Sequence, residues 1–270
     1  MQKHRPPVCF SEGVVARPER SYSLWSFMRY GLISDIHGNL EALEAVLAAL
    51  KEESVDQILC LGDVIGYGPN PNECVKLIQQ YAAICLIGNH DEASLGRVDL
   101  DFFNYMARQA IEWTTGQLSE DSKKFLMSLP HSHSYGTFMI VHASPDEPTR
   151  WNYILNLEDA ARGFAAFHEQ ICFIGHSHTP WVIPLQPDGG MRVRHDYPVD
   201  FKKNHRYLIN IGSVGQPRDR NPDAAFGILD MEPLQYTLKR VPYDVAKTQQ
   251  KIRATGALPA FLADRLATGQ

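Results

Sequence analysis

The sequence lacks a long hydrophobic run and a strong excess of either charge. No stretch approaches the roughly eighteen consecutive apolar residues that a transmembrane helix needs, so we expect no membrane partner. The net charge is −5 and the pI is near 6.1, which gives no global attraction to nucleic acid or to anionic lipid. We therefore expect no bulk binding of nucleic acid.

Paired cysteines are absent as well. The chain has five cysteines, none of them in a CxxC pair. An odd count without paired spacing is typical of a reducing compartment, and we expect a cytoplasmic location. Cys60, Cys85 and Cys172 lie inside apolar runs, where we interpret them as small buried hydrophobic residues.

No internal repeat, low-complexity segment or linker interrupts the chain after residue 28. Its 270 residues fit one large domain, so we predict a single domain over residues 28–270. Residues 1–27 contain three arginines and three prolines but no apolar core of a secretory signal. We interpret this leader as disordered, with Met28 as an alternative start.

Short apolar runs alternate with helical patterns in the first half, and strands dominate later. Asn39 is expected to cap one helix, and Asn70 with Pro71 to open another. Further helices are predicted over 102–115, over 119–128 with Ser119 as its cap, over 157–167 and in a C-terminal segment, 244–268, with an interruption near Gly256 to Pro259. Strands are predicted over 181–185, 191–195, 206–211, 224–230 and 235–241. This order predicts an α/β (α+β) fold, a four-layer αββα sandwich of two mixed β-sheets flanked by helices.

Five apolar runs each end in a cluster of ligand-type residues. An apolar run of about four to eight residues before such a cluster is typical of a buried strand that ends at a site. Strand ends meet at one edge of an α/β sheet, so these side chains should converge, in a number that suits two ions. The clusters are Asp35-Ile36-His37, Gly62-Asp63, Gly88-Asn89-His90-Asp91, Val141-His142 and Gly175-His176-Ser177-His178.

In this order the clusters resemble the calcineurin-like metallophosphoesterase superfamily. That family has the pattern DxH, GD, GNH followed by an acid, a later His, and GHxH, and the resemblance covers roughly residues 29–230. It implies a dinuclear metal site. One metal would be held by Asp35, His37 and His178, and the other by Asn89, His142 and His176.

The resemblance also implies roles for two further residues. Asp63 would bridge the two metals through its two carboxylate oxygens, and His90 would lie near the leaving group without binding metal. Mixed imidazole and carboxylate ligands suit divalent transition metals, with Mn as our first choice and Fe, Zn, Ni or Co as alternatives. We therefore predict a phosphoesterase in which a metal-bridging hydroxide attacks phosphorus in line.

Residues after Asp63 bear on the type of ester. Protein serine/threonine phosphatases and symmetrical dinucleoside tetraphosphatases carry a further aspartate three residues after the GD block. That aspartate orients the catalytic histidine, and an arginine that binds phosphate follows it. This chain has Gly66 and Tyr67 instead, which argues against both classes and leaves the orientation of His90 unexplained. The segments 62–71 and 212–218 resemble compact prokaryotic phosphodiesterases, phosphatases and hydrolases of diadenosine polyphosphates.

The expected substrate is thus a small phosphodiester or nucleotide anhydride. Arg218 is our candidate phosphate clamp, because a guanidinium matches phosphate oxygens. Tyr67 would stack on a base or lean on the metal pocket, and the helical region 92–130 would form a cap that selects substrate or would cover a sheet face.

Several alternatives remain open. The chain could be a protein phosphatase or a phosphomonoesterase, or a non-catalytic metal-binding scaffold like the vacuolar sorting subunit related to this superfamily. The intact ligand set and His90 argue against a scaffold. Asp91 would either orient a neighbour or cap a helix, and His131 and His133 are interpreted as solvated. The sequence makes no prediction of the oligomeric state.

Overall fold

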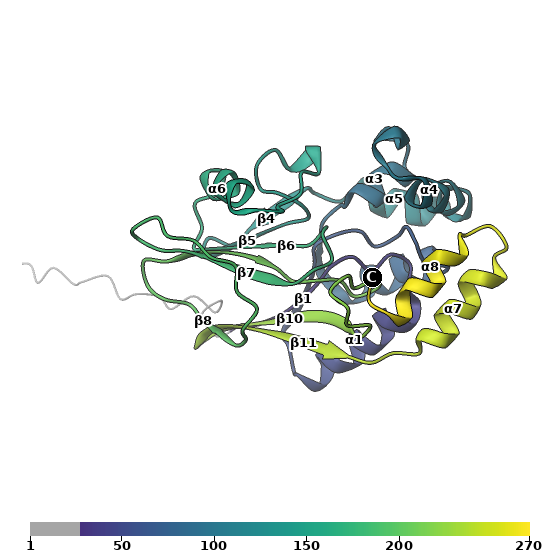
Figure 1. The fold of residues 1–270 in the computed structure, drawn as a ribbon. Helices are drawn as coiled ribbons and strands as arrows, with labels where there is room; N and C mark the ends of the chain where they lie inside the picture. The colour runs from purple at the N-terminus through teal and green to yellow at the C-terminus, as the bar shows by residue number, and fades with distance from the viewer. Residues whose placement is uncertain (1–27) are drawn as a thin grey trace, which may run out of the picture.

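The computed structural model describes residues 28–270, and these form two mixed β-sheets that lie face to face (Figure 1). The leader that we expect over residues 1–27 lies outside the described residues, as does Cys9. The first sheet has the order β3-β2-β1-β10-β11-β8, in which β1, β2 and β3 are parallel. Its strands are β1 (Arg29–Ile33), β2 (Gln57–Cys60), β3 (Ala82–Cys85), β8 (Val199–Asp200), β10 (Ala224–Met231) and β11 (Leu234–Val241).

The second sheet has the order β4-β5-β6-β9-β7, in which β5, β6 and β9 are parallel. Large apolar side chains of the two sheets, such as Leu32, Phe138 and Phe173, form a common buried core between them. This shared core supports our proposal that residues 28–270 are one domain. The strands are β4 (Ser132–Ser134), β5 (Phe138–Val141), β6 (Ile171–Ile174), β7 (Trp181–Leu185) and β9 (Arg206–Asn210).

Helices cover the outer face of each sheet. The apolar sides of α1 (Leu40–Glu52) and α2 (Pro71–Tyr81) pack on the first sheet, and α6 (Leu157–Ala165) packs on the second. Figure 1 shows α6 and α1 on opposite outer sides of the paired sheets. The predicted four-layer αββα sandwich is confirmed.

The caps explain where the first helices begin. Asn39 accepts a hydrogen bond from the Ala42 amide at the start of α1, as predicted. Asn70 and Pro71 also take the predicted cap and first positions of α2, but the Asn70 side chain makes no cap bond and donates to Glu73 instead. α1 begins shortly after His37 and α2 begins after the loop that follows Asp63, so the start of each helix anchors a loop of the candidate site.

The helical region that follows β3 differs from the prediction at its start. It contains α3 (Asn89–Ser94), the short 3₁₀ helix η2 (Leu100–Phe102), α4 (Tyr105–Gln117) and α5 (Glu120–Met127). The helix predicted over 102–115 begins at Tyr105, because Asn104 accepts from the Ala107 amide and caps it there. The predicted cap of α5 by Ser119 is confirmed.

The strand predicted over 191–195 is wrong. Within it, only Met191 and Arg194 make isolated bridges to β7, and the segment forms no ladder. Strands β4 and β8 have no apolar run and were not predicted. None of the helices within residues 28–270 is both long and apolar enough to cross a membrane. Four free cysteines are buried, which confirms the interpretation of Cys60, Cys85 and Cys172.

The C-terminal segment forms an interrupted helical region, as predicted. It contains α7 (Val245–Ala254), α8 (Ala260–Asp264) and the 3₁₀ helix η4 (Arg265–Ala267), with the predicted interruption between α7 and α8. Ile252 and Leu262 of this segment pack with Tyr67 and with Ala107 of α4. The C-terminal helices therefore support one side of the loop that follows Asp63. Another 3₁₀ helix, η3 (Pro148–Arg150), follows β5.

Candidate active site

The predicted convergence of the strand-end clusters is observed. Backbone hydrogen bonds join the loops: the Asp35 amide donates to the Gly62 carbonyl at 3.0 Å, and the Gly175 amide donates to the His142 carbonyl at 2.9 Å. The ligand-type side chains that these loops carry are buried and lie within 4.8 Å of one another in overlapping groups of three. Two sheets thus contribute to one site.

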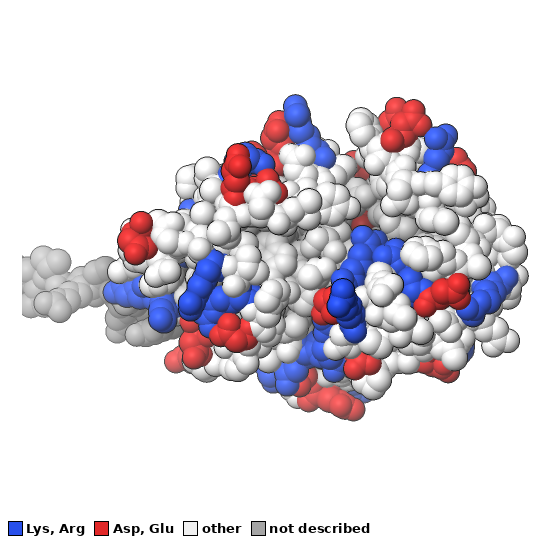
Figure 2. Space-filling view, viewed as in Figure 1, with Lys and Arg blue, Asp and Glu red and all other residues white. Residues whose placement is uncertain are grey.

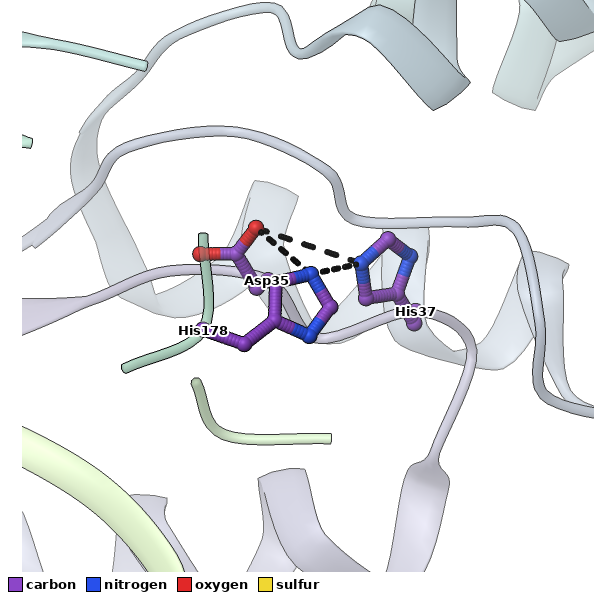
Figure 3. A group of neighbouring side chains, drawn as sticks. All are labelled: Asp35, His37 and His178. Atoms are coloured by element: carbon purple, nitrogen blue, oxygen red, sulfur yellow. Dashed lines mark hydrogen bonds and ion pairs between the residues drawn. The ribbon is translucent and has the colours of Figure 1, made fainter. Parts of the chain in front are cut away.

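Asp35, His37 and His178 form the first group (Figure 3). Nε2 of His37 lies 3.0 Å from Nε2 of His178. Oδ1 of Asp35 lies 3.3 Å from Nε2 of His178 and 3.9 Å from Nε2 of His37. Figure 3 shows the three side chains turned toward one another, which is the arrangement that a shared cation requires.

Asp63, His142 and His176 form the second group. Nε2 of His142 lies 3.3 Å from Oδ2 of Asp63 and 3.3 Å from Oδ1 of Asn89. Nε2 of His176 is buried and has no hydrogen-bond partner among the described residues. The expected set of Asn89, His142 and His176 is therefore together in space, and one of its nitrogens is free to bind an ion.

Asp63 lies between the two groups. Its Oδ2 is 3.6 Å from Nε2 of His37 in the first group and 3.3 Å from Nε2 of His142 in the second. Its Oδ1 accepts a hydrogen bond of 2.9 Å from the His90 amide. We expect both oxygens to bridge, but in the structure one oxygen alone faces both groups, because the other is held by the backbone of α3.

The tautomers of three histidines show that the cluster fits metal cations. Nδ1 of His37, His142 and His178 donates to the backbone carbonyls of Ile65, Leu61 and Gln216, respectively, at 3.1, 2.9 and 2.7 Å. Since a carbonyl can only accept, Nδ1 carries the proton in each of the three rings, and Nε2 offers a lone pair to the cluster when the ring is neutral. These lone pairs face each other and carboxylate oxygens, so a cation is the partner that fits.

Burial keeps several of these rings neutral. It lowers the pKa of His37 well below the ordinary value, and it lowers the pKa of His176 to about 3. The pKa of His178 is lowered as well, first by burial and then by the charge of Arg218. The neutral imidazole is the form that binds metal.

The carboxylates stay ionised despite their burial. Burial alone would raise the pKa of Asp35, but the contact with His178 lowers it overall. Burial would likewise raise the pKa of Asp63, and His142 brings it well below its usual range. Burial lowers the pKa of His142, but the Asp63 carboxylate raises it to about 9. The candidate site thus holds two ionised carboxylates, Asp35 and Asp63, which the neighbouring histidines stabilise.

Five of the candidate ligands have left-handed backbone conformations. For residues other than glycine this costs on the order of 1 kcal/mol each, and such residues cluster at functional sites. Each one turns the chain sharply at a strand end. They are Asp35 with φ of 54°, His37 with 51°, Asp63 with 53°, His176 with 66° and His178 with 60°.

Packing orients the His90 ring, whose orientation the sequence did not explain. Its ring lies against Tyr67, His37 and Phe103, at centroid distances of 4.5, 4.8 and 5.2 Å. Its Nδ1 is buried without a partner among residues 28–270, and burial lowers its pKa to about 4. A ring nitrogen also lies within 4.8 Å of ligand atoms of His37 and Asp63. Aromatic contacts therefore replace the orienting carboxylate.

By the resemblance described above, Gly66 stands where protein serine/threonine phosphatases carry that carboxylate. Its φ is +134°, and a Cβ there would lie 2.9 Å from Nδ1 of His37 and 2.9 Å from Nδ1 of His90. Only glycine accommodates both the conformation and the two rings.

We therefore expect Gly66→Ala to displace both rings. The predicted result is a fall in kcat of about ten-fold or more and a loss of about 1–3 kcal/mol in the free energy of unfolding. Chemical unfolding and steady-state kinetics measure the two effects. Gly116→Ala is the control, because a Cβ there meets nothing within 4 Å. Normal kcat in Gly66→Ala would show that activity does not require the close approach of this backbone position to the two histidine rings.

Tyr67 and Arg218 lie beside these histidines. Tyr67 is only 7% exposed and its ring is 4.7 Å from that of His37, so it packs against the candidate metal cluster. The Arg218 guanidinium lies 5.7 Å from the centre of the Tyr67 ring and donates to Oε1 of Gln216 at 2.8 Å. No carboxylate within the described chain forms an ion pair with Arg218. Both residues line a cavity of about 710 Å³, together with His90 and Asn89.

The structure also shows the surroundings of Asp91, His131 and His133. Asp91 caps α3 by accepting from the Gly88 amide, and it also accepts from the Ile65 amide, so it fixes two loops. The interpretation of His131 and His133 as solvated is wrong in part. His131 donates to Glu92 at 3.0 Å, and His133 lies in β4 and is only half-buried.

Trp151 and Tyr153 contact the candidate ligands but were not predicted to lie at the site. The Tyr153 ring stacks on His176 at a centroid distance of 4.0 Å and an angle of 23°, and Trp151 contacts the edge of His142 at 5.9 Å. Both residues belong to the irregular loop after β5, which gives no periodic signal. Their spacing of two residues in the loop that follows His142 was the one available hint.

Comparisons with known proteins agree with this geometry. A family profile described as the calcineurin-like phosphoesterase superfamily domain matches residues 28–233. An uncharacterised protein of Methanocaldococcus jannaschii is 39% identical over 245 residues, which are 88% of this chain and 97% of that protein.

Two solved structures are also similar. The crystal structure of a metallophosphoesterase from Sphaerobacter thermophilus has a TM-score of 0.79 and 43% identity, and it covers 90% of this chain and 100% of that chain. The crystal structure of a hypothetical protein from Pyrococcus horikoshii OT3 has a TM-score of 0.71 at 20% identity, with 90% and 98% covered, and shows the shared fold alone.

Proposed function

This chain belongs to the calcineurin-like phosphoesterase superfamily and is a metal-dependent hydrolase of phosphoric esters, and from that premise we propose that it uses two divalent metal ions to hydrolyse a small phosphodiester or a nucleotide anhydride. The observation that carries the proposal is the position of Asp63. One carboxylate oxygen of Asp63 faces His37 of one group at 3.6 Å and His142 of the other at 3.3 Å.

In this proposal the side chains divide the work between two ions. The first site consists of Asp35, His37 and His178, and the second of Asn89, His142 and His176, with Asp63 shared. Two divalent ions, with manganese as our first choice, would activate water for in-line attack and offset the charge on the phosphoryl oxygens. The backbone carbonyls that hold Nδ1 keep each ring in the tautomer that binds metal.

His90 is proposed to act on the leaving group. It lines the open cavity, and its ring is held by Tyr67 and Phe103 rather than by a charged partner. From this position it would donate a proton to the departing oxygen or stabilise the charge that develops there. Among the described residues, none of the four histidines proposed as metal ligands has a ring contact with Phe103.

Arg218 is proposed to bind a phosphate oxygen, with Tyr67 as its support. Removal of a charged hydrogen bond costs roughly 1.5–3 kcal/mol, so we expect Arg218→Ala to raise KM about ten-fold or more. Steady-state kinetics measure this, with the exposed Arg192→Ala as the control for loss of charge. An unchanged KM in Arg218→Ala would remove Arg218 from the substrate site.

The surface favours a small substrate over a polynucleotide. Figure 2 shows basic and acidic side chains mixed over one face of the molecule, with one group of Lys and Arg around the place where Figure 1 marks the C-terminus. This face has no extended basic track of the kind that binds a nucleic-acid backbone. We propose a small phosphorylated substrate and a cytoplasmic location.

Removal of metal tests the proposed function. Purified protein is stripped with a chelator and assayed on bis(p-nitrophenyl) phosphate and on p-nitrophenyl phosphate, with and without Mn²⁺. We expect hydrolysis of the diester only after Mn²⁺ is restored. Hydrolysis of the monoester alone would indicate a phosphatase instead. Inactivity on both esters, in folded and metal-loaded protein, would favour the scaffold.

A further inference from the structure

The cavity beside the candidate metal cluster is larger than hydrolysis of a phosphoryl group requires. Its volume is about 710 Å³, which lies in the range that encloses a drug-sized ligand. Asn89, His90 and His176 belong to its lining and connect it with the candidate active site. The remaining lining residues therefore face whatever is attached to the phosphate.

Two segments that are distant in sequence form this outer lining. Arg97 and Phe102 come from the helical region between β3 and β4, and Arg150 and Tyr153 come from the loop after β5. The first segment is the region 92–130 for which the sequence left a choice between a cap and a sheet cover. Since it lines the same cavity as His90, a role in substrate selection is favoured.

Two aromatic rings in this lining are exposed. Phe102 is 85% exposed and belongs to none of the apolar clusters of the described residues. Tyr153 is 46% exposed although one face of its ring stacks on His176. Exposed aromatic side chains on a cavity wall gain apolar burial when a planar ligand stacks on them.

The charges of the lining favour a ligand that carries phosphate. Arg97, Arg150 and Arg218 line the cavity, and Asp99 is the one carboxylate among the lining residues described. No ion pair within residues 28–270 involves Arg97 or Arg218, whereas Arg150 contacts Glu147 at 3.1 Å. Guanidinium groups without carboxylate partners bind phosphate oxygens well.

The backbone of the second segment is held in an unusual conformation. Glu147 and Trp151 lie on either side of the 3₁₀ helix η3 and have left-handed φ values of 51° and 58°. Such conformations persist in non-glycine residues where the surrounding structure enforces them, often at ligand sites. Here they place Arg150 and Tyr153 on the cavity.

We propose that the outer part of this cavity binds the nucleobase of a nucleotide substrate, with Phe102 and Tyr153 as the stacking residues. The nucleotide's phosphate lies toward His90 and Arg218, a placement that rests on the proposed function. Phe102 is the more informative residue to change, because Tyr153 also touches the candidate ligand His176.

Calorimetric titration of the full chain in the presence of Mn²⁺ tests the proposal. The two probes are AMP and ribose 5-phosphate, which share the sugar and the phosphate and differ in the base. We expect the wild-type protein to bind AMP at least ten-fold more tightly, as base–aromatic stacking predicts. Phe102→Ala and Phe102→Leu should bring the two dissociation constants to within about two-fold of each other, and Phe102→Tyr should restore the difference.

Tyr105→Ala is the matched control. Tyr105 is 68% exposed in the same helical region but does not line the cavity, so this variant should keep the preference for AMP. Equal affinity of the wild-type protein for both probes, or binding of neither at millimolar concentration, would overturn the proposal. So would a preference for AMP that survives in Phe102→Ala.

This outcome is separable from that of the metal-dependent assay. A preference for AMP that depends on Phe102, in a protein without phosphoesterase activity, would retain the base site and reject the proposed hydrolysis. Metal-dependent hydrolysis together with equal binding of AMP and ribose 5-phosphate would do the reverse.

Discussion

Replacement of Asp63 by asparagine is expected to weaken both metal sites at once. The carboxylate is buried, and its Oδ2 faces ligand nitrogens of both groups. Loss of one partner from a buried charged cluster costs about 3–5 kcal/mol, so we expect activity to fall on the order of 10³-fold. Metal content should fall from two ions per chain to fewer than one at the same free Mn²⁺ concentration.

The asparagine variant is chosen because it preserves the local fold. The asparagine Oδ1 can still accept from the His90 amide, so α3 keeps its start. Asp99→Asn is the control, since it removes a carboxylate that lines the neighbouring cavity but lies outside the cluster. Metal analysis by plasma mass spectrometry and kinetics on the same samples give the result. Two retained ions in Asp63→Asn would contradict a shared ligand.

His90→Ala is expected to separate catalysis from metal binding. The variant should keep both ions and lose about 10²–10⁴-fold in kcat, which is the usual contribution of a proton donor. The loss should be large for an alkyl leaving group, which needs a proton, and small for p-nitrophenolate, which does not. Comparison of the two substrates therefore tests the role directly.

Two results would contradict this role for His90. Full turnover of the alkyl ester by His90→Ala would exclude a proton donor at this position. Loss of one ion from His90→Ala would make His90 a ligand, which its proximity to His37 and Asp63 allows. His131→Ala controls for loss of a nearby histidine, because His131 pairs with Glu92 outside the cluster.

Much of the fold could be predicted because the apolar runs are unambiguous. The runs before Asp35, Asp63, Asn89, His142 and His176 each form a strand in the structure, and each strand is buried at the end that leads into its cluster. Strands β4 and β8 could not be predicted, since β4 is the polar segment Ser132–Ser134 and β8 has two residues. Their pairing depends on neighbouring strands rather than on their own pattern.

The candidate ligands could be named from the sequence, but their geometry could not. Local motifs name His37 and Asp63, whereas the orientation that turns one oxygen of Asp63 toward both groups depends on an amide of α3 that folding brings to it. The orientation of His90 likewise depends on Tyr67 and Phe103, which no motif connects with it. Contacts between distant segments set these features.

The walls of the cavity were the least predictable part. Phe102 was placed at the start of a helix by its apolar pattern, but Asn104 caps α4 two residues later and leaves Phe102 exposed in η2. Tyr153 lies in a loop without periodicity, and its stacking on His176 is visible only in three dimensions. Substrate selection is therefore the property that most needs the structure.

Anomalous diffraction from crystals grown with Mn²⁺ tests the central claim most directly. We predict two peaks about 3.5–4 Å apart, the spacing of two-metal hydrolases. One peak should lie among Asp35, His37 and His178, the other among Asn89, His142 and His176, with Asp63 between them. A single peak at full occupancy, or peaks outside these residues, would contradict a dinuclear centre.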